Sequence, residues 1–127
     1  RGANRLGISQ EYARLGDALG VRHLEDPGED FCSSGHLYLT GIPGITEQRR
    51  QEIVVERAEM GVATNVHYNP LPMMTAYKAL GFNIKNYPNA FKMFENEITL
   101  PLNTKMTDEN VEYVIEDFIE CVKALEG

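Results

Sequence analysis

Apolar residues recur with the spacing of an amphipathic helix near both ends of the chain. In residues 4–19 they lie at i, i+4, i+7 and i+11 and so share one face: Ile8, Tyr12, Leu15 and Leu19. Gly20 suits the left-handed residue that ends many helices. A longer apolar face follows Thr107, which can cap a helix: Val111, Val114, Ile115, Phe118, Ile119, Val122 and Leu125. The sequence therefore predicts a helix at each end of one domain.

Alternation with a period of two predicts strands between these helices. The alternating segments are residues 36–42, 62–68 and 97–102. In the first segment Leu37 and Leu39 share one face, and in the last the shared face holds Ile98, Leu100 and Leu102. Turn-rich, acidic residues 25–35 precede the first strand and predict a surface loop.

Further helices are predicted between the strands. One runs from a Thr46 cap to about Met60, where Gly61 ends it, and shorter ones occupy residues 73–80 and a segment that begins at Pro88. The order helix, strand, helix, strand, helix, helix, strand, helix indicates an α+β fold. We expect a small antiparallel or mixed sheet of about three strands, with helices covering one face.

Composition narrows the class of partner. The 127 residues are enough for one domain, and 43% of them are hydrophobic, which suffices for a packed core. A net charge of −7 argues against nucleic acid or an anionic membrane as the main partner, since both reward clustered cations. The sequence also contains no apolar run long enough to span a bilayer.

Cysteine usage bears on the compartment. Cys32 and Cys121 lie far apart and belong to no paired-cysteine motif. Two reduced thiols predict a cytoplasmic protein, and a disulfide between them remains the alternative. The chain begins at Arg1 with neither an initiator Met nor an apolar signal core, which fits an excised piece or a processed chain.

The common catalytic signatures are absent from the sequence. It contains no GxGxxG, GxxxxGK[ST], HExxH or GxSxG motif, and His23, His36 and His67 are too widely spaced to predict a metal site. Residues 65–72 differ from plain scaffold, because polar side chains at a strand end precede a proline-stiffened turn. There Asn65 and His67 share a face, and an imidazole can hydrogen-bond a ligand. The alternative is that His67 is a structural histidine at the end of a strand.

The order of several short segments resembles the C-terminal domain of the DegT/DnrJ/EryC1/StrS aminotransferases. The segments are Gly61-Val-Ala-Thr-Asn-Val-His-Tyr-Asn-Pro-Leu, Ala76-Tyr77, Leu80-Gly81, Leu100-Pro-Leu and Thr107-Asp-Glu-Asn-Val-Glu-Tyr-Val-Ile115. Ser34-Gly-His-Leu-Tyr38 and an opening helix with Arg5 and Tyr12 fit the same template. The resemblance covers essentially the whole chain in the right order.

This resemblance implies part of a pyridoxal-phosphate (PLP) enzyme that aminates keto sugars, commonly nucleotide-linked ones, with glutamate or glutamine as the amino donor. In the family, the large N-terminal domain supplies the Schiff-base lysine, the acid partner of the pyridinium nitrogen and the phosphate cup. The lysines of this chain match no family lysine motif: Lys78, Lys85, Lys92, Lys105 and Lys123. The resemblance therefore implies that PLP is bound mainly by the absent domain and that this chain alone is inactive.

The same resemblance assigns residues 1–127 to the small C-terminal domain, with a linker helix over 1–20 and an α+β body over 21–127. The implied partners are its own N-terminal large domain, a second subunit in a homodimer and a keto-sugar substrate. As the helix that joins the two domains, residues 4–19 would need a partner for their apolar face. The natural chain would then continue well upstream of Arg1.

The resemblance also implies substrate-binding residues, which we assign where this sequence matches the family's motif. His67 and Tyr68 match the Gly-x-x-x-x-x-His-Tyr segment of the family, which faces the active-site cleft, so the resemblance implies that both bind substrate. Asn65 shares the face of His67 and is a further candidate. Family members often carry a histidine at the positions of Pro72 and Asn103. These two departures leave the identity of the sugar open.

Two other functions remain as alternatives. A free-standing, non-catalytic α+β binding or interaction module derived from the family would begin near residue 1 and would bury the apolar face of residues 4–19 by itself. An acetylating or hydrolytic enzyme is less consistent with the sequence, because no nucleophile and base form a recognisable pair.

Overall fold

A computed structural model of the chain describes residues 2–23, 30 and 36–126. Most of the loop expected over 25–35, including Cys32, lies outside this range. The elements in chain order are α1 (Gly2–Leu19), β1 (Arg22–His23), β2 (Tyr38–Gly41), α2 (Glu47–Glu59), the 3-10 turn η1 (Leu71–Met73), α3 (Thr75–Ala79), the 3-10 turn η2 (Ile84–Asn86), α4 (Pro88–Glu95), β3 (Glu97–Leu100) and α5 (Asp108–Glu126). No described helix is both long and apolar enough to cross a membrane.

The sheet is small and antiparallel, with the strand order β1-β2-β3. Its main pair is β2 with β3, in a register that places Tyr38 opposite Leu100 and Leu39 opposite Thr99. A two-residue strand β1 at the edge was not predicted from the sequence. The α+β class and the antiparallel arrangement are confirmed.

The prediction of a strand over residues 62–68 is wrong. Only Asn65 pairs with the sheet, through an isolated bridge in which the Thr99 N–H donates to Asn65 O at 2.8 Å and the Asn65 N–H donates to Thr99 O at 3.2 Å. The next two backbone donors bind side chains instead, since Val66 N–H donates to Asn65 Oδ1 and His67 N–H donates to Glu97 Oε2. Side-chain acceptors of this kind compete with a backbone ladder and end the pairing.

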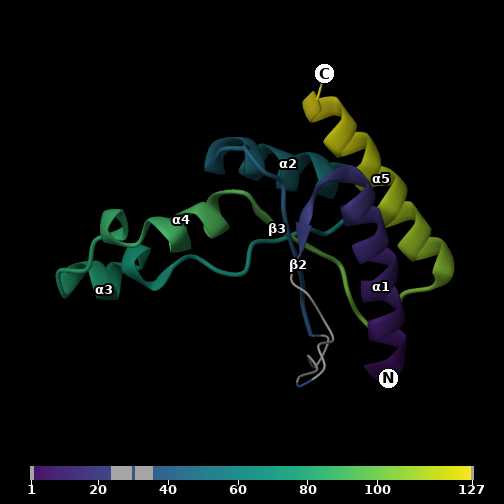
Figure 1. Ribbon diagram of the computed structural model, residues 1–127, viewed down its shortest axis with the longest axis horizontal. Coiled ribbons are helices and arrows are strands. Elements are labelled where there is room, and N and C mark those ends of the chain that lie inside the picture. Colours follow the sequence, from purple (N-terminus) through teal and green to yellow (C-terminus); the bar gives the residue numbers. More distant parts are fainter. Residues whose placement is uncertain (1, 24–29, 31–35, 127) are drawn as a thin grey trace.

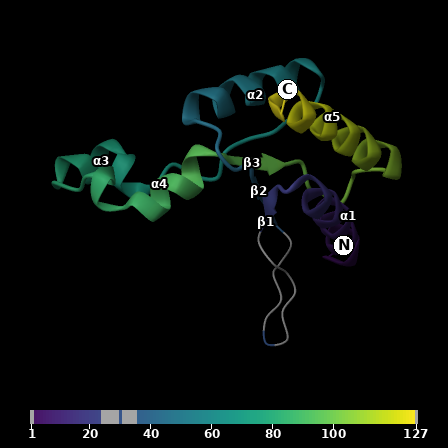
Figure 2. The ribbon, with the colours of Figure 1, turned by 45° about the horizontal axis from the view of Figure 1, so that its top comes forward.

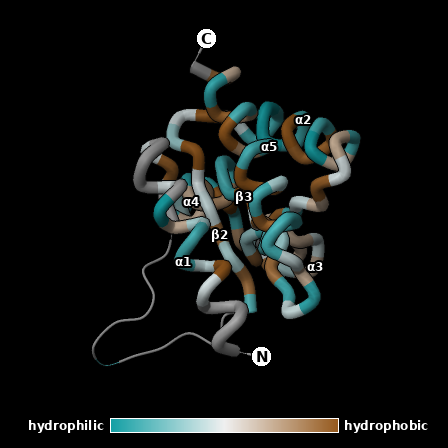
Figure 3. The backbone as a smooth tube through the Cα atoms, turned by 90° about the vertical axis from the view of Figure 1, so that its right-hand side faces the viewer, coloured by the Kyte–Doolittle hydropathy of each residue, from teal (hydrophilic) through white to brown (hydrophobic). Residues whose placement is uncertain are grey.

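Helices α1, α2 and α5 cover one face of the sheet (Figures 1 and 2). Alternation along the strands turns Tyr38, Ile98 and Leu100 toward these helices, and all three belong to the buried core. The helices contribute Ile8, Tyr12, Ile53, Val111, Val114, Phe118, Cys121 and Val122 to the same core. Polar and apolar residues alternate along α2 and α5 in Figure 3, as expected of helices with one buried face. The opposite face of the sheet carries Leu39, Glu97 and Thr99.

The helix ends follow the sequence signals. At the start of α2, the Arg49 N–H donates to the side-chain oxygen of Thr46 at 3.2 Å, which confirms the predicted cap. At the start of α5, Asn110 N–H donates to Thr107 Oγ1 at 3.1 Å and Thr107 N–H donates to Asn110 Oδ1 at 3.0 Å. These reciprocal bonds satisfy backbone donors that a helix start otherwise leaves unpaired.

Helix α1 packs on the rest of this chain. Ile8 and Tyr12 are buried, and the Tyr12 hydroxyl donates to Pro101 O at 2.8 Å. The ring centroids of Tyr12 and Tyr38 are 5.2 Å apart. Ile8 and Tyr12 therefore have their partner within the chain, contrary to the expectation for a linker helix. The side chains of Leu15 and Leu19 lie outside the described part.

Residues 68–93 extend away from this body as an arm that carries η1, α3, η2 and part of α4 (Figure 1). No residue of η1, α3 or η2 is buried. Large apolar side chains are exposed along the arm: Tyr68, Leu71, Met74, Tyr77, Leu80, Phe82, Tyr87 and Met93. Most of the large apolar side chains that are exposed in the described part of the chain therefore lie on the arm.

Candidate functional site

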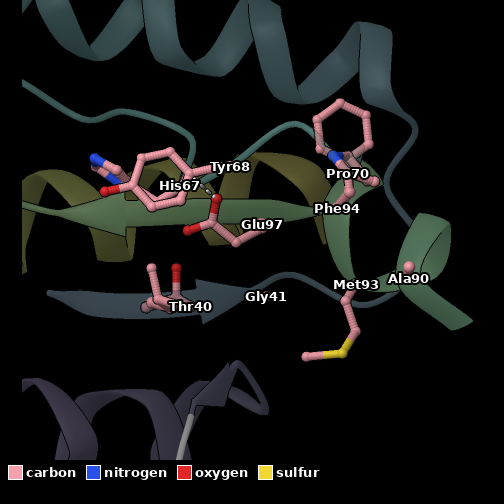
Figure 4. Close-up of a pocket in the computed structure, with 10 residues that line it drawn as sticks. Thr40, Gly41, His67, Tyr68, Pro70, Ala90, Met93, Phe94 and Glu97 are labelled. Atoms are coloured by element: carbon pink, nitrogen blue, oxygen red, sulfur yellow. Dashed lines mark hydrogen bonds between the residues drawn. The ribbon is translucent and has the colours of Figure 1, made fainter. Parts of the chain in front are cut away.

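A pocket of about 250 Å³ lies between the sheet and the base of the arm. Its polar end holds His67, Tyr68 and Glu97, and its apolar end is formed by the arm and α4 (Figure 4). The complete lining is Leu39, Thr40, Gly41, His67, Tyr68, Pro70, Ala90, Met93, Phe94 and Glu97. A few polar groups at one end of an apolar cavity is the usual character of a small-molecule site.

His67 is held from two sides. Its backbone N–H donates to Glu97 Oε2 at 2.9 Å, and its ring Nδ1 lies 2.8 Å from Thr99 Oγ1. The Thr99 hydroxyl in turn donates to Glu97 Oε1 at 2.6 Å. Glu97 and Thr99 are 7% and 5% exposed, so water competes little for these bonds.

The surroundings of Glu97 shift the pKa of its carboxyl group. Burial raises the pKa of Glu97, while the hydrogen bonds from Thr99 and from the His67 N–H and the charge of Arg50 oppose the increase. Arg50 is fully buried in α2, and burial lowers its pKa. Its Nη1 donates to Phe94 O at 2.5 Å, and its guanidinium carbon lies 4.4 Å from the centre of the Phe94 ring. Arg50 therefore fixes one apolar wall of the pocket and supplies a positive charge behind it.

The structure brings two of the three predicted site residues together. The ring centroids of His67 and Tyr68 are 4.6 Å apart in an edge-to-face arrangement, and Tyr68 is 66% exposed. Both residues line the pocket. Asn65 does not line it, because its Oδ1 accepts the Val66 N–H at 2.7 Å and its backbone bridges Thr99. Whether any of the three binds substrate remains a prediction.

Sequence reasoning missed Glu97 and Thr99. A usable signal was present, since a period of two places both on the face of the last strand that Ile98 and Leu100 leave free. An acid at the start of a short, otherwise uncharged strand marks a polar site. The contribution of α4 through Ala90, Met93 and Phe94 follows from tertiary packing and had no local signal.

The residues of this chain do not fit PLP. The cofactor needs a lysine for its Schiff base, and each of the five lysines is exposed and none lines the pocket. In the described part of the chain, no three His, Cys, Asp or Glu side chains are grouped to hold a metal ion. The thiol of Cys121 is free and buried, and burial raises its pKa. Within the described part of the chain, the pocket is therefore lined by no lysine that could form a Schiff base.

Comparison with known proteins identifies relatives over nearly the whole chain. A protein of Streptococcus pneumoniae described as a sugar aminotransferase, Spr1654, solved in PMP, PLP and apo forms, is 44% identical in its PMP form. That structure superposes with a TM-score of 0.91 over 96% of this chain and 31% of its own. The spore coat polysaccharide biosynthesis protein SpsC of Bacillus subtilis is 30% identical over 75% of this chain and 25% of its own length. Helicobacter pylori PseC, at 22% identity and a TM-score of 0.83, shares the fold.

These matches show the family of the chain and how much of its relatives' length the chain spans. This chain spans about a third of the solved Spr1654 chain and a quarter of SpsC. The sequence profile of the DegT/DnrJ/EryC1/StrS aminotransferase family matches residues 3–119. The chain therefore belongs to the DegT/DnrJ/EryC1/StrS aminotransferase family.

Proposed function

We propose that this chain is the small C-terminal domain of a PLP-dependent aminotransferase that aminates a nucleotide-linked keto sugar. The observation that carries the proposal is the 44% identity and the TM-score of 0.91 to Spr1654 over 96% of this chain and 31% of that one. Because SpsC is a spore coat polysaccharide biosynthesis protein, the proposal extends to polysaccharide biosynthesis. Because a nucleotide-linked sugar is a cytosolic metabolite, we place the reaction in the cytoplasm.

PLP would be bound by the large N-terminal domain, which lies outside this chain. The exposed position of all five lysines supports this division, since a Schiff-base lysine must lie in the cofactor pocket. The cofactor, when bound there, would supply the electron sink for amino transfer. This chain would close the other side of the cleft and contribute substrate contacts, and it would be inactive alone.

The proposed substrate contacts are His67 and Tyr68, with Asn65 as an outer contact. Imidazole and phenol groups at the polar end of the pocket can hydrogen-bond sugar hydroxyls. The apolar end would exclude water from the bound sugar. A structural role for His67 is the alternative, and the Thr99 and Glu97 bonds are compatible with both roles.

Two partners are proposed for the exposed arm and the body: the N-terminal large domain and a second subunit in a homodimer. The arm, residues 68–93, supports the first, because its exposed apolar side chains are continuous with the pocket through Tyr68 and Met93. Contiguous exposed apolar surface of this kind marks an interaction site. Hydrogen exchange of the arm should slow in the full-length enzyme relative to the isolated chain.

One observation favours the second candidate, a free-standing binding module. That function requires the chain to bury the apolar face of α1 by itself, and Ile8 and Tyr12 of this face are buried. Reading the natural coding sequence upstream of Arg1 separates the candidates. An open frame of a couple of hundred codons with a lysine in a cofactor-binding motif supports the aminotransferase, whereas a start codon close to Arg1 supports the module.

The aminotransferase proposal is tested with the natural full-length protein and with this chain alone. The full-length protein should bind PLP, show aldimine absorbance and transfer an amino group from glutamate or glutamine to a nucleotide-linked keto sugar. The 127-residue chain should show no such band. An aldimine band in the isolated chain that borohydride removes would overturn the assignment of PLP to the absent domain.

A further inference from the structure

The hydrogen bonds behind His67 determine which of its ring nitrogens carries a hydrogen. Thr99 Oγ1 lies between His67 Nδ1, at 2.8 Å, and Glu97 Oε1, at 2.6 Å. When Glu97 is ionised, its carboxylate can only accept, so the one hydroxyl hydrogen of Thr99 points to Glu97. Thr99 Oγ1 is then left as an acceptor toward the imidazole. It follows that His67 Nδ1 carries a hydrogen and donates it to Thr99.

The surroundings of Thr99 disfavour the opposite orientation of its hydroxyl group, toward His67. Glu97 Oε2 accepts the backbone N–H of His67 at 2.9 Å, so one carboxylate holds the backbone of His67 directly and its ring through Thr99. Both Glu97 and Thr99 lie on the same face of β3 and are almost fully buried. Burial removes the water molecules that could otherwise reorient the hydroxyl.

The other ring nitrogen is available to a ligand. Within the described part of the chain, no hydrogen bond involves His67 Nε2, and His67 lines the pocket. In a neutral imidazole the nitrogen without hydrogen is an acceptor. With Nδ1 protonated, Nε2 therefore presents a lone pair.

We propose that Thr99, oriented by Glu97, is a positioning residue that holds His67 in its Nδ1–H form, so that Nε2 accepts a hydrogen bond from a hydroxyl group of the substrate. The second half of this statement rests on the proposed function, because it assumes that a hydroxylated substrate enters the pocket. The first half is a property of this chain alone. It selects a ligand that donates to His67 and rejects one that offers only an acceptor at that point.

The form of His67 is measurable by NMR in the 127-residue chain with 15N-labelled histidine. In the uncharged form of His67, Nδ1 should give the shift of a protonated ring nitrogen and Nε2 that of an unprotonated one. The His67→Gln variant identifies the signals among those of the three histidines. A spectrum with the hydrogen on Nε2 would overturn the proposal without any variant of Thr99.

Variants of Thr99 test its role. Thr99→Val removes the acceptor, so the hydrogen should move to Nε2, the form that free histidine favours, while Thr99→Ser should retain the wild-type spectrum. Thr40→Val is the matched control, because it removes another buried hydroxyl of the same sheet that donates to Ile98 O. An unchanged His67 spectrum in a folded Thr99→Val chain would overturn the role of Thr99.

Activity of the full-length enzyme tests the use of Nε2 separately. Thr99→Val should lower kcat/KM about tenfold, the order of one hydrogen bond, and Thr99→Ser should restore most of it. If the spectra are as expected and Thr99→Val leaves kcat/KM unchanged, the acceptor role of Nε2 toward the substrate is wrong. If the full-length wild-type protein does not transaminate, the proposed function fails, whereas the tautomer result is decided by the spectra alone.

Discussion

Replacing Phe118 with alanine tests the packing of α5 on the sheet. Phe118 is 2% exposed and belongs to the core that Ile98 and Leu100 form with the helices. A buried aromatic side chain removes roughly 150–200 Å² from water, which at about 25 cal/mol per Å² is roughly 4–5 kcal/mol. Measured Phe→Ala changes in cores span about 3–5 kcal/mol. We therefore expect Phe118→Ala to lower the free energy of unfolding by about 3–5 kcal/mol.

The assay is urea unfolding followed by circular dichroism. The midpoint should fall while the slope m is unchanged, because the surface exposed on unfolding is nearly the same. Such a loss is a large share of the roughly 5–15 kcal/mol typical of a domain, so refolding must be checked at low urea. Glu116→Ala, on the exposed side of the same helix, is the control and should change stability by less than about 0.5 kcal/mol. A loss below about 1 kcal/mol for Phe118→Ala would refute the packing of α5.

Two further predictions concern the attachment of α1 and the pH dependence of stability. Tyr12→Phe removes the hydrogen bond to Pro101 O and should lower the free energy of unfolding in urea by about 1 kcal/mol. Tyr113→Phe removes an exposed hydrogen bond to Met60 O and should lower it by less. Equal losses of unfolding free energy would contradict the burial assigned to Tyr12. Because the pKa of Glu97 is raised in the fold, the native state binds more protons than the unfolded state above the usual glutamate pKa of about 4.3, so stability falls as the pH rises through the native pKa. Glu97→Gln removes this loss, and the difference in unfolding free energy, variant minus wild type, should be larger near pH 8 than near pH 4; a difference independent of pH would show that the pKa is not raised.

Elements with a strong local pattern were predicted well from the sequence. Helices α1 and α5 combine an apolar face with a stop or cap residue, α2 is bounded by a cap and a stop residue, and β3 follows the alternation of Ile98 and Leu100. The strand over 62–68 failed because its donors bind the side chains of Asn65 and Glu97, and alternation alone does not register such bonds. Strand β1 was missed because two residues carry no period.

The site was predicted in part for the same reason. His67 and Tyr68 stood out through their types and the proline turn after them, and the resemblance named them. Glu97 and Thr99 reach His67 only because the segment before His67 bridges β3, which is a long-range contact. The cover of Ile8 and Tyr12 in α1 also comes from distant parts of the same chain, which the local pattern does not show.

The role proposed for His67 is to contact the substrate of a sugar aminotransferase rather than to stabilise the fold. The most direct measurement compares kcat/KM and melting temperature of the full-length enzyme with those of its His67→Ala and His36→Ala variants, His36 being an exposed histidine outside the pocket. We predict that His67→Ala impairs turnover more than it lowers the melting temperature, with kcat/KM falling by about tenfold or more, or roughly 1.4 kcal/mol of transition-state stabilisation. His36→Ala should change neither quantity. A His67→Ala enzyme with intact kcat/KM and a lowered melting temperature would contradict the claim and assign His67 to the fold.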